Sequence, residues 1–142
     1  MEIIGEIIDE FGRSLFEEID YYCEADNAER FAALFVDNPA VTIPKVERLL
    51  SARRVLTTSW IQGTKLRDRQ ELKTQRLDPP ALIRTGVISG LQQLLEYGYF
   101  HADPHPGNLL ALEDGRLCYL DFGMMSEVSR SSRSGLIQAV VH

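Results

Sequence analysis

Apolar residues recur every three or four positions over residues 2–22, and this period predicts an amphipathic helix. Its apolar face comprises Ile3, Ile4, Ile7, Ile8, Phe11, Leu15, Ile19 and Tyr22. Glu18 falls in the middle of that face, where burying an unpaired carboxylate would be costly. The pattern therefore predicts a partner cation or a water-filled cleft beside Glu18. A structural ion pair at the edge of the helix is the alternative.

The next stretch predicts one helix and two strands. Asp26 is a typical helix start, and the apolar residues that follow it continue to Phe35. Residues 46–50 and 55–60 have the composition of two paired strands. Lys45 ends a segment that resembles the phosphate-binding strand of kinases. Pro44 is unfavourable in a central strand, so we predict that Lys45 lies on the surface.

The second half of the chain predicts helices around a hairpin. Residues 65–73 are polar and predict a short helix and a loop. A longer helix should begin at Pro79, continue to about Tyr97 and end at Gly98. Residues 109–120 predict two strands joined by a tight Glu-Asp-Gly turn. A last helix is expected over residues 129–141.

Composition and charge narrow the choice of partners. The chain has 21 acidic and 15 basic residues, and its net charge of -6 argues against nucleic-acid binding. No apolar run approaches the roughly 18 residues of a membrane span, so none is expected in this segment. Cys23 and Cys118 have no metal-site spacing and are interpreted as reduced interior residues of an intracellular protein.

The candidate chemistry lies in the segment from His101 to Gly123. Asp103 follows His101 by two positions, Asn108 follows five later, and Asp121 opens an Asp-Phe-Gly triplet. This is the order of the kinase catalytic core. In that chemistry Asp103 would accept the proton of the acceptor, and Asn108 and Asp121 would hold Mg²⁺ against the phosphates of ATP. The hairpin should return Asp121 to the side of Asn108.

Two other classes of function use the same residues. His101, Asp103 and His105 alternate along the chain and could be zinc ligands of a hydrolase. Pro104, Pro106 and the correctly spaced kinase motif argue against this alternative. A non-catalytic nucleotide-binding scaffold, or pseudokinase, would share every motif, so only measured chemistry separates it from an enzyme.

Four blocks of the sequence resemble the UbiB family of atypical kinases, also called ABC-one, which is linked to coenzyme Q and other prenylquinones. These blocks are residues 101–108, 120–127, 18–31 and 55–63. The third block resembles the E-x-D segment of the family and the fourth resembles its hinge. Together they extend over most of the chain.

The resemblance implies an α+β, protein-kinase-like fold that is partial. Residues 1–60 would form part of the small lobe, with an αC-type helix and late strands, and residues 64–142 the first part of the helical large lobe. Trp60, Ile61 and Gln62 would form the hinge and contact the adenine through their backbone.

The resemblance also implies roles for single side chains. Glu18 would pair with a phosphate-binding lysine, and Asp20 and Glu24 would line the site. Periodicity alone places Asp20 and Glu24 on the solvent face. His101 would stabilise residues 101–108, which the resemblance makes the catalytic loop, as the matching histidine does in kinases.

By resemblance, the full-length protein would be a phosphotransferase or ATPase that uses ATP or ADP with Mg²⁺ and supports ubiquinone or other prenylquinone synthesis. His105 and the Gly107-Asn108 pair also resemble small-molecule phosphotransferases of the aminoglycoside and choline kinase type. Quinone-biosynthesis proteins or a lipid-like substrate are the expected partners.

The expected location is the cytoplasm or a membrane surface, and a plastid or mitochondrion in a eukaryote. No phosphate-binding loop or strand lysine stands upstream of Glu18. We therefore expect an internal part of a longer protein, inactive when isolated.

Overall fold

The chain is described by a computed structural model over residues 20–141, so Glu18 and nearly all of the predicted first helix lie outside the described residues. In chain order the elements are α2 (Tyr21–Leu34), β1 (Val41–Thr42), a 3-10 helix (Arg48–Leu50), β2 (Thr64–Lys65), α3 (Arg69–Thr74), α4 (Pro79–Leu91), a π-helical segment (Gln92–Tyr97), β3 (Tyr99–His101), a second 3-10 helix (Pro106–Asn108), β4 (Leu109–Ala111), β5 (Leu117–Tyr119), β6 (Met125–Glu127) and α5 (Arg130–Val141).

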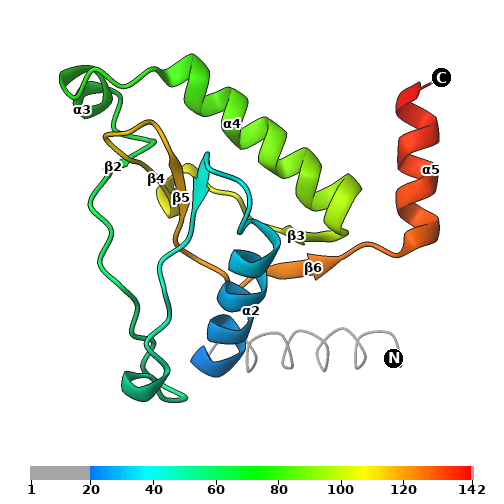
Figure 1. Cartoon of the computed structure of the whole chain (residues 1–142), viewed down its shortest axis with the longest axis horizontal. Helices are drawn as coiled ribbons and strands as arrows, with labels where there is room; N and C mark the ends of the chain where they lie inside the picture. The colour runs from blue at the N-terminus through cyan, green and yellow to red at the C-terminus, as the bar shows by residue number, and fades with distance from the viewer. Residues whose placement is uncertain (1–19, 142) are drawn as a thin grey trace, which may run out of the picture.

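Two small sheets organise the described residues (Figure 1). The first has the strand order β1-β5-β4-β2, with β1 parallel to β5 and the other neighbours antiparallel. Leu110 lies opposite Cys118, and the turn between β4 and β5 contains Gly115 at a φ of 85°. This confirms the predicted hairpin. The second sheet pairs β3 with β6, which the sequence pattern did not predict.

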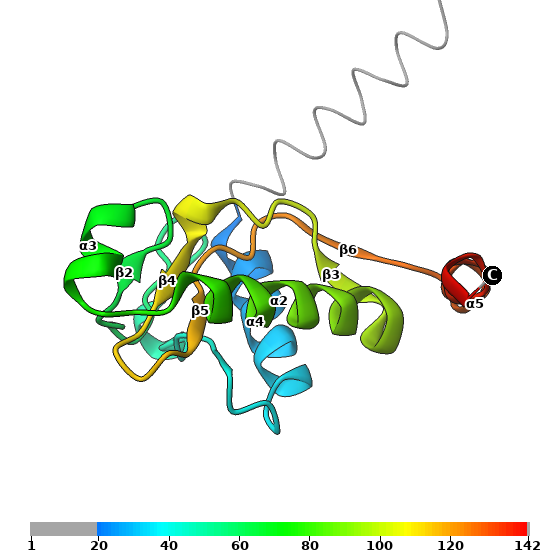
Figure 2. The same cartoon turned by 90° about the horizontal axis from the view of Figure 1, so that it is seen from above.

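The helices of the second half agree with the sequence pattern. The predicted helix from Pro79 is α4, and its last turns continue as the π-helical segment up to Gly98, which has a φ of 69°. A buried hydrogen bond of 2.8 Å joins Ser89 Oγ on this helix to Tyr119 OH on β5. α5 stands apart from the sheets, beyond β6, in both views (Figures 1 and 2).

The helix predicted to begin at Asp26 begins earlier. Asp20 caps α2, since its Oδ1 accepts a hydrogen bond of 3.1 Å from the Tyr22 backbone N–H, and the helix continues to Leu34. Asp26 instead forms an ion pair with Arg48. Cys23 is exposed, so its predicted interior position is wrong, whereas Cys118 is buried as expected.

The predicted strand pair over residues 46–60 is wrong in its regular form. The two segments approach each other in antiparallel fashion, with Glu47 N–H donating to Thr57 O at 2.9 Å, but Arg48–Leu50 forms a 3-10 turn. Ser51 Oγ accepts a hydrogen bond of 3.0 Å from Thr57 N–H and so replaces a ladder bond. Lys45 is exposed and pairs with Glu47, which confirms its surface position.

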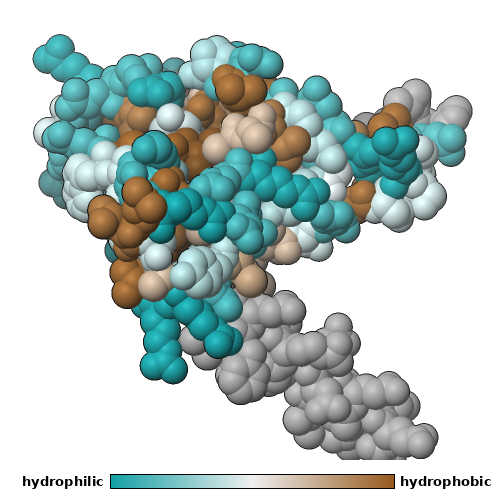
Figure 3. Space-filling model, turned by 60° about the horizontal axis from the view of Figure 1, so that its bottom comes forward, coloured by the Kyte–Doolittle hydropathy of each residue, from teal (hydrophilic) through white to brown (hydrophobic). Residues whose placement is uncertain are grey.

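Hydrophobic side chains are partly exposed over this first half of the chain. Figure 3 shows brown patches interrupting the hydrophilic surface. Leu49, Leu50, Val55 and Trp60 are among the most exposed large apolar residues that the structure describes. None of the helices in the described ranges has both the length and the apolar character needed to cross a membrane.

The core joins α2 to the hairpin and to the triplet that begins at Asp121. Phe31 is fully buried, and its ring centroid lies 5.2 Å from that of Tyr119 and 5.3 Å from that of Phe122. Phe35 stacks on Phe31 at 4.7 Å. Aromatic pairs at these distances contribute attraction beyond their buried area. Phe31 is therefore the residue through which α2 packs on the candidate site.

Replacing Phe31 with alanine should lower the free energy of unfolding by about 3–5 kcal/mol, because the change removes buried surface and leaves a cavity. That is a large share of the roughly 5–15 kcal/mol of a typical domain. Urea unfolding followed by circular dichroism measures it. Val36→Ala is the control, since Val36 is 77% exposed and should change the value by less than about 0.5 kcal/mol. Equal effects of both substitutions would contradict this account of the core.

Candidate active site

Asn108 and Asp121 meet at the open end of the hairpin. Asn108 immediately precedes β4 and Asp121 follows β5 by two residues, so the antiparallel pairing brings them together. Asn108 Nδ2 donates a hydrogen bond of 3.0 Å to Asp121 Oδ2. The backbone pairing extends to this point, because Leu120 N–H donates to Asn108 O at 3.0 Å. The predicted convergence of the two residues is confirmed.

The remaining contacts of Asp121 leave room for a cation. Asp121 Oδ1 accepts a hydrogen bond of 2.9 Å from Gly123 N–H, and each carboxylate oxygen has a further lone pair. A carboxylate and an amide oxygen are ligands that Mg²⁺ takes together with water and phosphate oxygens. Within residues 20–141 no group of three or more His, Cys, Asp and Glu side chains is placed to hold a metal. The donor set therefore fits Mg²⁺ carried by a nucleotide better than a metal held by protein alone.

His101 is a structural link within the catalytic loop. Its ring is buried, and Nδ1 accepts a hydrogen bond of 3.1 Å from Asp103 N–H. Nε2 consequently carries the proton and donates to Asp121 O at 2.6 Å. Both ring nitrogens are thus used by backbone groups, which agrees with the predicted stabilising role and argues against zinc binding. His105 Nδ1 accepts from Gly107 N–H at 3.1 Å instead.

Asp103 and Asp121 line the same small cavity. Its volume is about 230 Å³, and its lining residues are Tyr21, Glu24, His101, Asp103, Asp121, Gly123 and Met124. The Asp103 residue is exposed to solvent, whereas Asp121 is partly buried. One carboxylate is therefore accessible to an acceptor while the other is held in place beside Asn108.

Glu24 on α2 is a site residue that sequence periodicity missed. Its Oε1 accepts a hydrogen bond of 3.3 Å from Phe122 N–H. Burial raises the pKa of Glu24, the bond from Phe122 lowers it in part, and the charge of Asp121 raises it again. The helix phase taken from residue 2 placed Glu24 in solvent. Asp20 is the sequence signal that could have found Glu24. Asp20 caps α2, and helical periodicity counted from this cap places Glu24 on the same face as the buried residues Ala28 and Phe31.

Two further contacts fix α2 against the Asp-Phe-Gly triplet. Asn27 Nδ2 donates to Phe122 O at 2.9 Å, and Tyr99 OH donates to Asn27 Oδ1 at 2.8 Å. Asp20, which the resemblance also assigned to the site, caps the helix and pairs with Arg53 at 3.2 Å, and it does not line the cavity. Glu24 and Asn27 are therefore the α2 residues that hydrogen-bond the triplet, beside the packing of Phe31 on Phe122.

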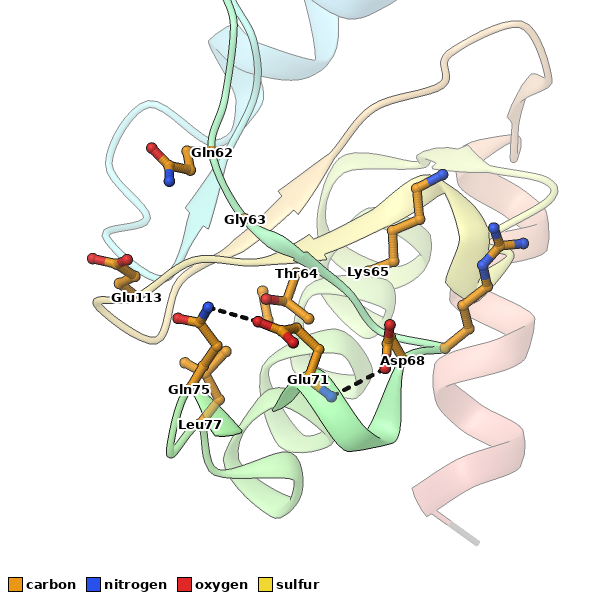
Figure 4. Close-up of a pocket in the computed structure, with 11 residues that line it drawn as sticks. Gln62, Gly63, Thr64, Lys65, Asp68, Glu71, Gln75, Leu77 and Glu113 are labelled. Atoms are coloured by element: carbon orange, nitrogen blue, oxygen red, sulfur yellow. Dashed lines mark hydrogen bonds between the residues drawn. The ribbon is translucent and has the colours of Figure 1, made fainter. Parts of the chain in front are cut away.

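The side chains of the three predicted hinge residues lie in different surroundings. The Trp60 side chain is 91% exposed. Ile61 and Leu120, both partly buried, pack against a buried cluster formed by Leu110, Leu112 and Cys118. Gln62 lines a separate cavity of about 360 Å³ with Asp68, Glu71, Glu113 and their neighbours (Figure 4). Contacts of their backbone with adenine remain a prediction.

A family model described as the ABC1 atypical kinase-like domain matches residues 1–142. The chain belongs to this family. The ABC1 assignment agrees with the resemblance drawn from the motifs around Asp103 and Asp121.

Curated relatives of this ABC1 chain are several times longer. The chain is 51% identical over 136 residues to the uncharacterized protein sll0005 of Synechocystis, covering 96% of this chain and 20% of that protein. It is 48% identical over 136 residues to Protein ACTIVITY OF BC1 COMPLEX KINASE 3, chloroplastic, of Arabidopsis thaliana, covering 96% and 19%. The chain therefore spans about a fifth of the length of these relatives.

A solved structure matches the fold. It is Rv3197 from Mycobacterium tuberculosis in complex with erythromycin, with a TM-score of 0.70 and 32% sequence identity, covering 85% of this chain and 30% of that one. Together with the ABC1 family match, this similarity identifies the mixed helix and sheet arrangement as a partial protein-kinase-like fold, as predicted.

The raised pKa of Glu24 predicts a pH dependence of stability. Because the folded-state pKa lies above the ordinary value of 4.5, the folded protein binds this proton more tightly than the unfolded chain does. Stability from this group is therefore fully present below pH 4.5 and is lost as the pH rises through the folded pKa. Glu24→Gln should reduce that loss and raise the melting temperature at pH 7, measured by thermal unfolding across pH 4–8.

Glu29→Gln is the matched control for this measurement. The hydrogen bond from Arg48 lowers the pKa of Glu29, so its contribution has the opposite sign and is lost as the pH falls. This substitution should slightly lower the melting temperature at pH 7, since the pair is exposed. A lower melting temperature for Glu24→Gln at pH 7 would show that the buried carboxylate stabilises the fold.

Proposed function

We propose that this chain is part of an atypical kinase or ATPase that uses ATP with Mg²⁺. The observation that carries the proposal is the 3.0 Å hydrogen bond between Asn108 and Asp121, in a motif that also places Asp103 and Asp121 in one cavity. Phosphoryl transfer needs mainly positioning and charge stabilisation. Asn108 and Asp121 would hold Mg²⁺, which neutralises the phosphates when it is bound, and Asp103 would take the proton of the acceptor.

Adenine has a suitable apolar surface next to the hinge. Leu110 and Leu112 belong to the cluster on which Ile61 packs, and Leu120 lies one residue before Asp121. A flat ring placed on this cluster would lie along the hairpin whose open end carries the proposed metal ligands. Backbone groups of residues 60–62 would then contact the adenine edge, while the exposed Trp60 side chain takes no part.

Glu24 is proposed as the carboxylate that pairs with a phosphate-binding cation. Phe122 N–H fixes its position, and the cavity of Asp121 is open to it. A cation placed there would favour the charged form of Glu24 and so oppose the effect of burial, which raises its pKa. Glu18, to which the sequence assigned this role, lies outside the described residues.

The proposed biological role is support of ubiquinone or other prenylquinone synthesis, with quinone-biosynthesis proteins or a lipid-like substrate as partners. It rests on the ABC1 family resemblance. The names of two Arabidopsis relatives carry the word chloroplastic, so a plastid is the compartment we propose in a photosynthetic eukaryote.

The test uses two proteins, residues 1–142 alone and a longer protein that contains them. Thermal-shift titration with ADP, with and without Mg²⁺, measures nucleotide binding, and release of phosphate from ATP measures turnover. We expect Mg²⁺-dependent binding and turnover in the longer protein, and no turnover in the isolated chain. Binding without turnover in the longer protein would favour the scaffold, and absence of any Mg²⁺-dependent binding would overturn the proposed site.

A further inference from the structure

A third cavity lies between α3, the first turns of α4 and the catalytic loop. α3 and the start of α4 lie at one end of the molecule (Figure 1). We call it the α3–α4 pocket. Its volume is about 410 Å³, and its lining residues are Leu66, Arg69, Leu72, Lys73, Pro79, Leu82, Ile83 and Pro106. This size falls within the range of about 300–1,000 Å³ that is usual for small-molecule sites.

The floor of the α3–α4 pocket is apolar and rigidly packed. Leu72 and Leu82 are each only 3% exposed and belong to one buried cluster with Ala111 of β4. Leu66 packs against the same cluster. Ile83 is 67% exposed and forms part of the wall. The pocket therefore offers an apolar surface that is open to an apolar ligand.

The charges that line the pocket are of one sign. Arg69 and Lys73 are one helical turn apart on α3, and neither forms an ion pair with any residue between 20 and 141. Like charges at this spacing destabilise a helix slightly. Among the residues that the structure describes, no acid lines the pocket, although the whole chain has a net charge of -6. An anionic group is the chemical partner that this pair of cations fits.

The acids at the start of α3, the capping residue Asp68 and Glu71 of the first turn, line the cavity of Gln62. In that cavity Gln75 also hydrogen-bonds Glu71 at 2.9 Å (Figure 4). Arg69 and Lys73 line the α3–α4 pocket. The short helix thus separates its charges between two cavities, which an even distribution of surface charge would not produce.

The position of the pocket relates it to phosphoryl transfer. Pro106, in its wall, is three residues after Asp103 on the catalytic loop. Asp103 itself lines the separate cavity of Asp121, so the catalytic loop is the segment that the two cavities share.

We propose that the α3–α4 pocket binds the phosphoryl acceptor and that this acceptor is a small amphiphile. Its apolar body lies on Leu72 and Leu82, its anionic group binds Arg69 and Lys73, and a hydroxyl reaches Asp103. This inference rests on the proposed function. In the transfer, the hydroxyl oxygen bonds to the γ-phosphorus of ATP and gives its proton to Asp103. The bond from that phosphorus to the bridging oxygen breaks, and ADP leaves with the electron pair.

Two fluorescent probes with the same aromatic body test the pocket directly. These are 1-anilinonaphthalene-8-sulfonate, an anion, and N-phenyl-1-naphthylamine, which is uncharged. We expect the unsubstituted longer protein to bind the sulfonate at least about tenfold more tightly than the amine. Hydrogen bonds from Arg69 and Lys73 to the sulfonate would add to the affinity that burial of the aromatic body gives both probes. The double variant Arg69→Gln with Lys73→Gln should lose this difference and keep its affinity for the amine.

Matched variants distinguish probe binding in the α3–α4 pocket from general effects of charge and hydrophobicity elsewhere on the surface. Lys65→Gln with Arg67→Gln removes the same charge from the neighbouring cavity and should keep the preference for the sulfonate. Ile83→Glu should weaken both probes, whereas Val87→Glu, one turn further along α4 and 57% exposed, should not. Equal affinity of the wild type for both probes, or equal losses in the two double variants, would overturn the site.

The acceptor role has a separate readout. With Mg²⁺ and ATP, the longer protein should convert 10-hydroxydecanoate to its phosphate ester, which mass spectrometry detects. The double variant of Arg69 and Lys73 should raise the KM for 10-hydroxydecanoate about tenfold or more without lowering kcat. Selective probe binding without ester formation overturns the acceptor role. Mg²⁺-dependent ADP binding is measured on the same protein. Selective probe binding without any ADP binding would reject the proposed function and leave the pocket as a binding site.

Discussion

Asp121→Asn should lower Mg²⁺-dependent nucleotide turnover about a hundredfold to a thousandfold in the longer protein, because it removes a negative ligand that the proposed metal needs. The fold should remain. Asparagine has nearly the same shape, and its oxygen can still accept the hydrogen bond from Gly123 N–H. The amide of Asn108 can turn to present its oxygen to the new side chain. The free energy of unfolding should therefore change by less than about 1 kcal/mol.

Asp114→Asn is the control for Asp121→Asn. It makes the same chemical change at an exposed turn, where Asp114 accepts hydrogen bonds from Arg116. Turnover and Mg²⁺-dependent ADP binding should remain at wild-type values. If Asp121→Asn leaves both quantities unaltered as well, the nucleotide site lies elsewhere in the protein.

Asp103→Asn should reduce turnover about a hundredfold to ten-thousandfold, since it removes the group proposed to take the acceptor proton. Nucleotide affinity should not change, because the role assigned to Asp103 concerns the acceptor and not the phosphates. The backbone N–H of Asp103 keeps its hydrogen bond to His101, so the loop should retain its conformation. Phosphate release and ADP binding, measured on the same preparation, separate the two effects.

Asp78→Asn provides the comparison for Asp103→Asn. Asp78 is exposed before α4 and forms no capping hydrogen bond through its side chain, so this substitution should leave turnover unchanged. A loss smaller than tenfold for Asp103→Asn would assign the base to another residue. Loss of ADP affinity in that variant would assign Asp103 to nucleotide binding instead.

The parts of the fold that the sequence predicted depend on local signals. Gly115 and Gly98 mark the hairpin turn and the end of the long helix, and both adopt the positive φ that glycine permits at little cost. Pro79 marks the start of that helix. The convergence of Asn108 and Asp121 follows from the hairpin register alone, which is why this part of the candidate site was predictable.

The structural predictions that were wrong concern places where the local sequence favours two conformations about equally. Asp20 and Asp26 are both suitable helix caps, and each also pairs with an arginine, Asp20 with Arg53 and Asp26 with Arg48, so the local sequence does not decide between them. The strand composition of residues 46–60 gave no sign that the hydroxyl of Ser51 would bond the backbone of Thr57. The exposure of Cys23 and the inward position of Glu24 both follow from where α2 begins.

The pairing of β3 with β6 could not be predicted from the local sequence pattern either. The two strands are three residues each, too short to show alternation, and their register joins Tyr99 to Glu127 across the catalytic loop and the hairpin. Arg30 strengthens this joint, because its guanidinium lies 3.9 Å from the centre of the Tyr99 ring and pairs with Glu127.

The contacts of α2 with the Asp-Phe-Gly triplet also determine when the site can form during folding. Asn27 and Phe122 are 95 positions apart in the chain, and Glu24 and Phe122 are 98 apart. The hairpin needs only neighbouring residues, whereas these contacts require closing a loop that contains most of the chain, and such non-local contacts slow folding. Asn108 and Asp121 should therefore meet early, and Glu24 should join them among the last steps of folding.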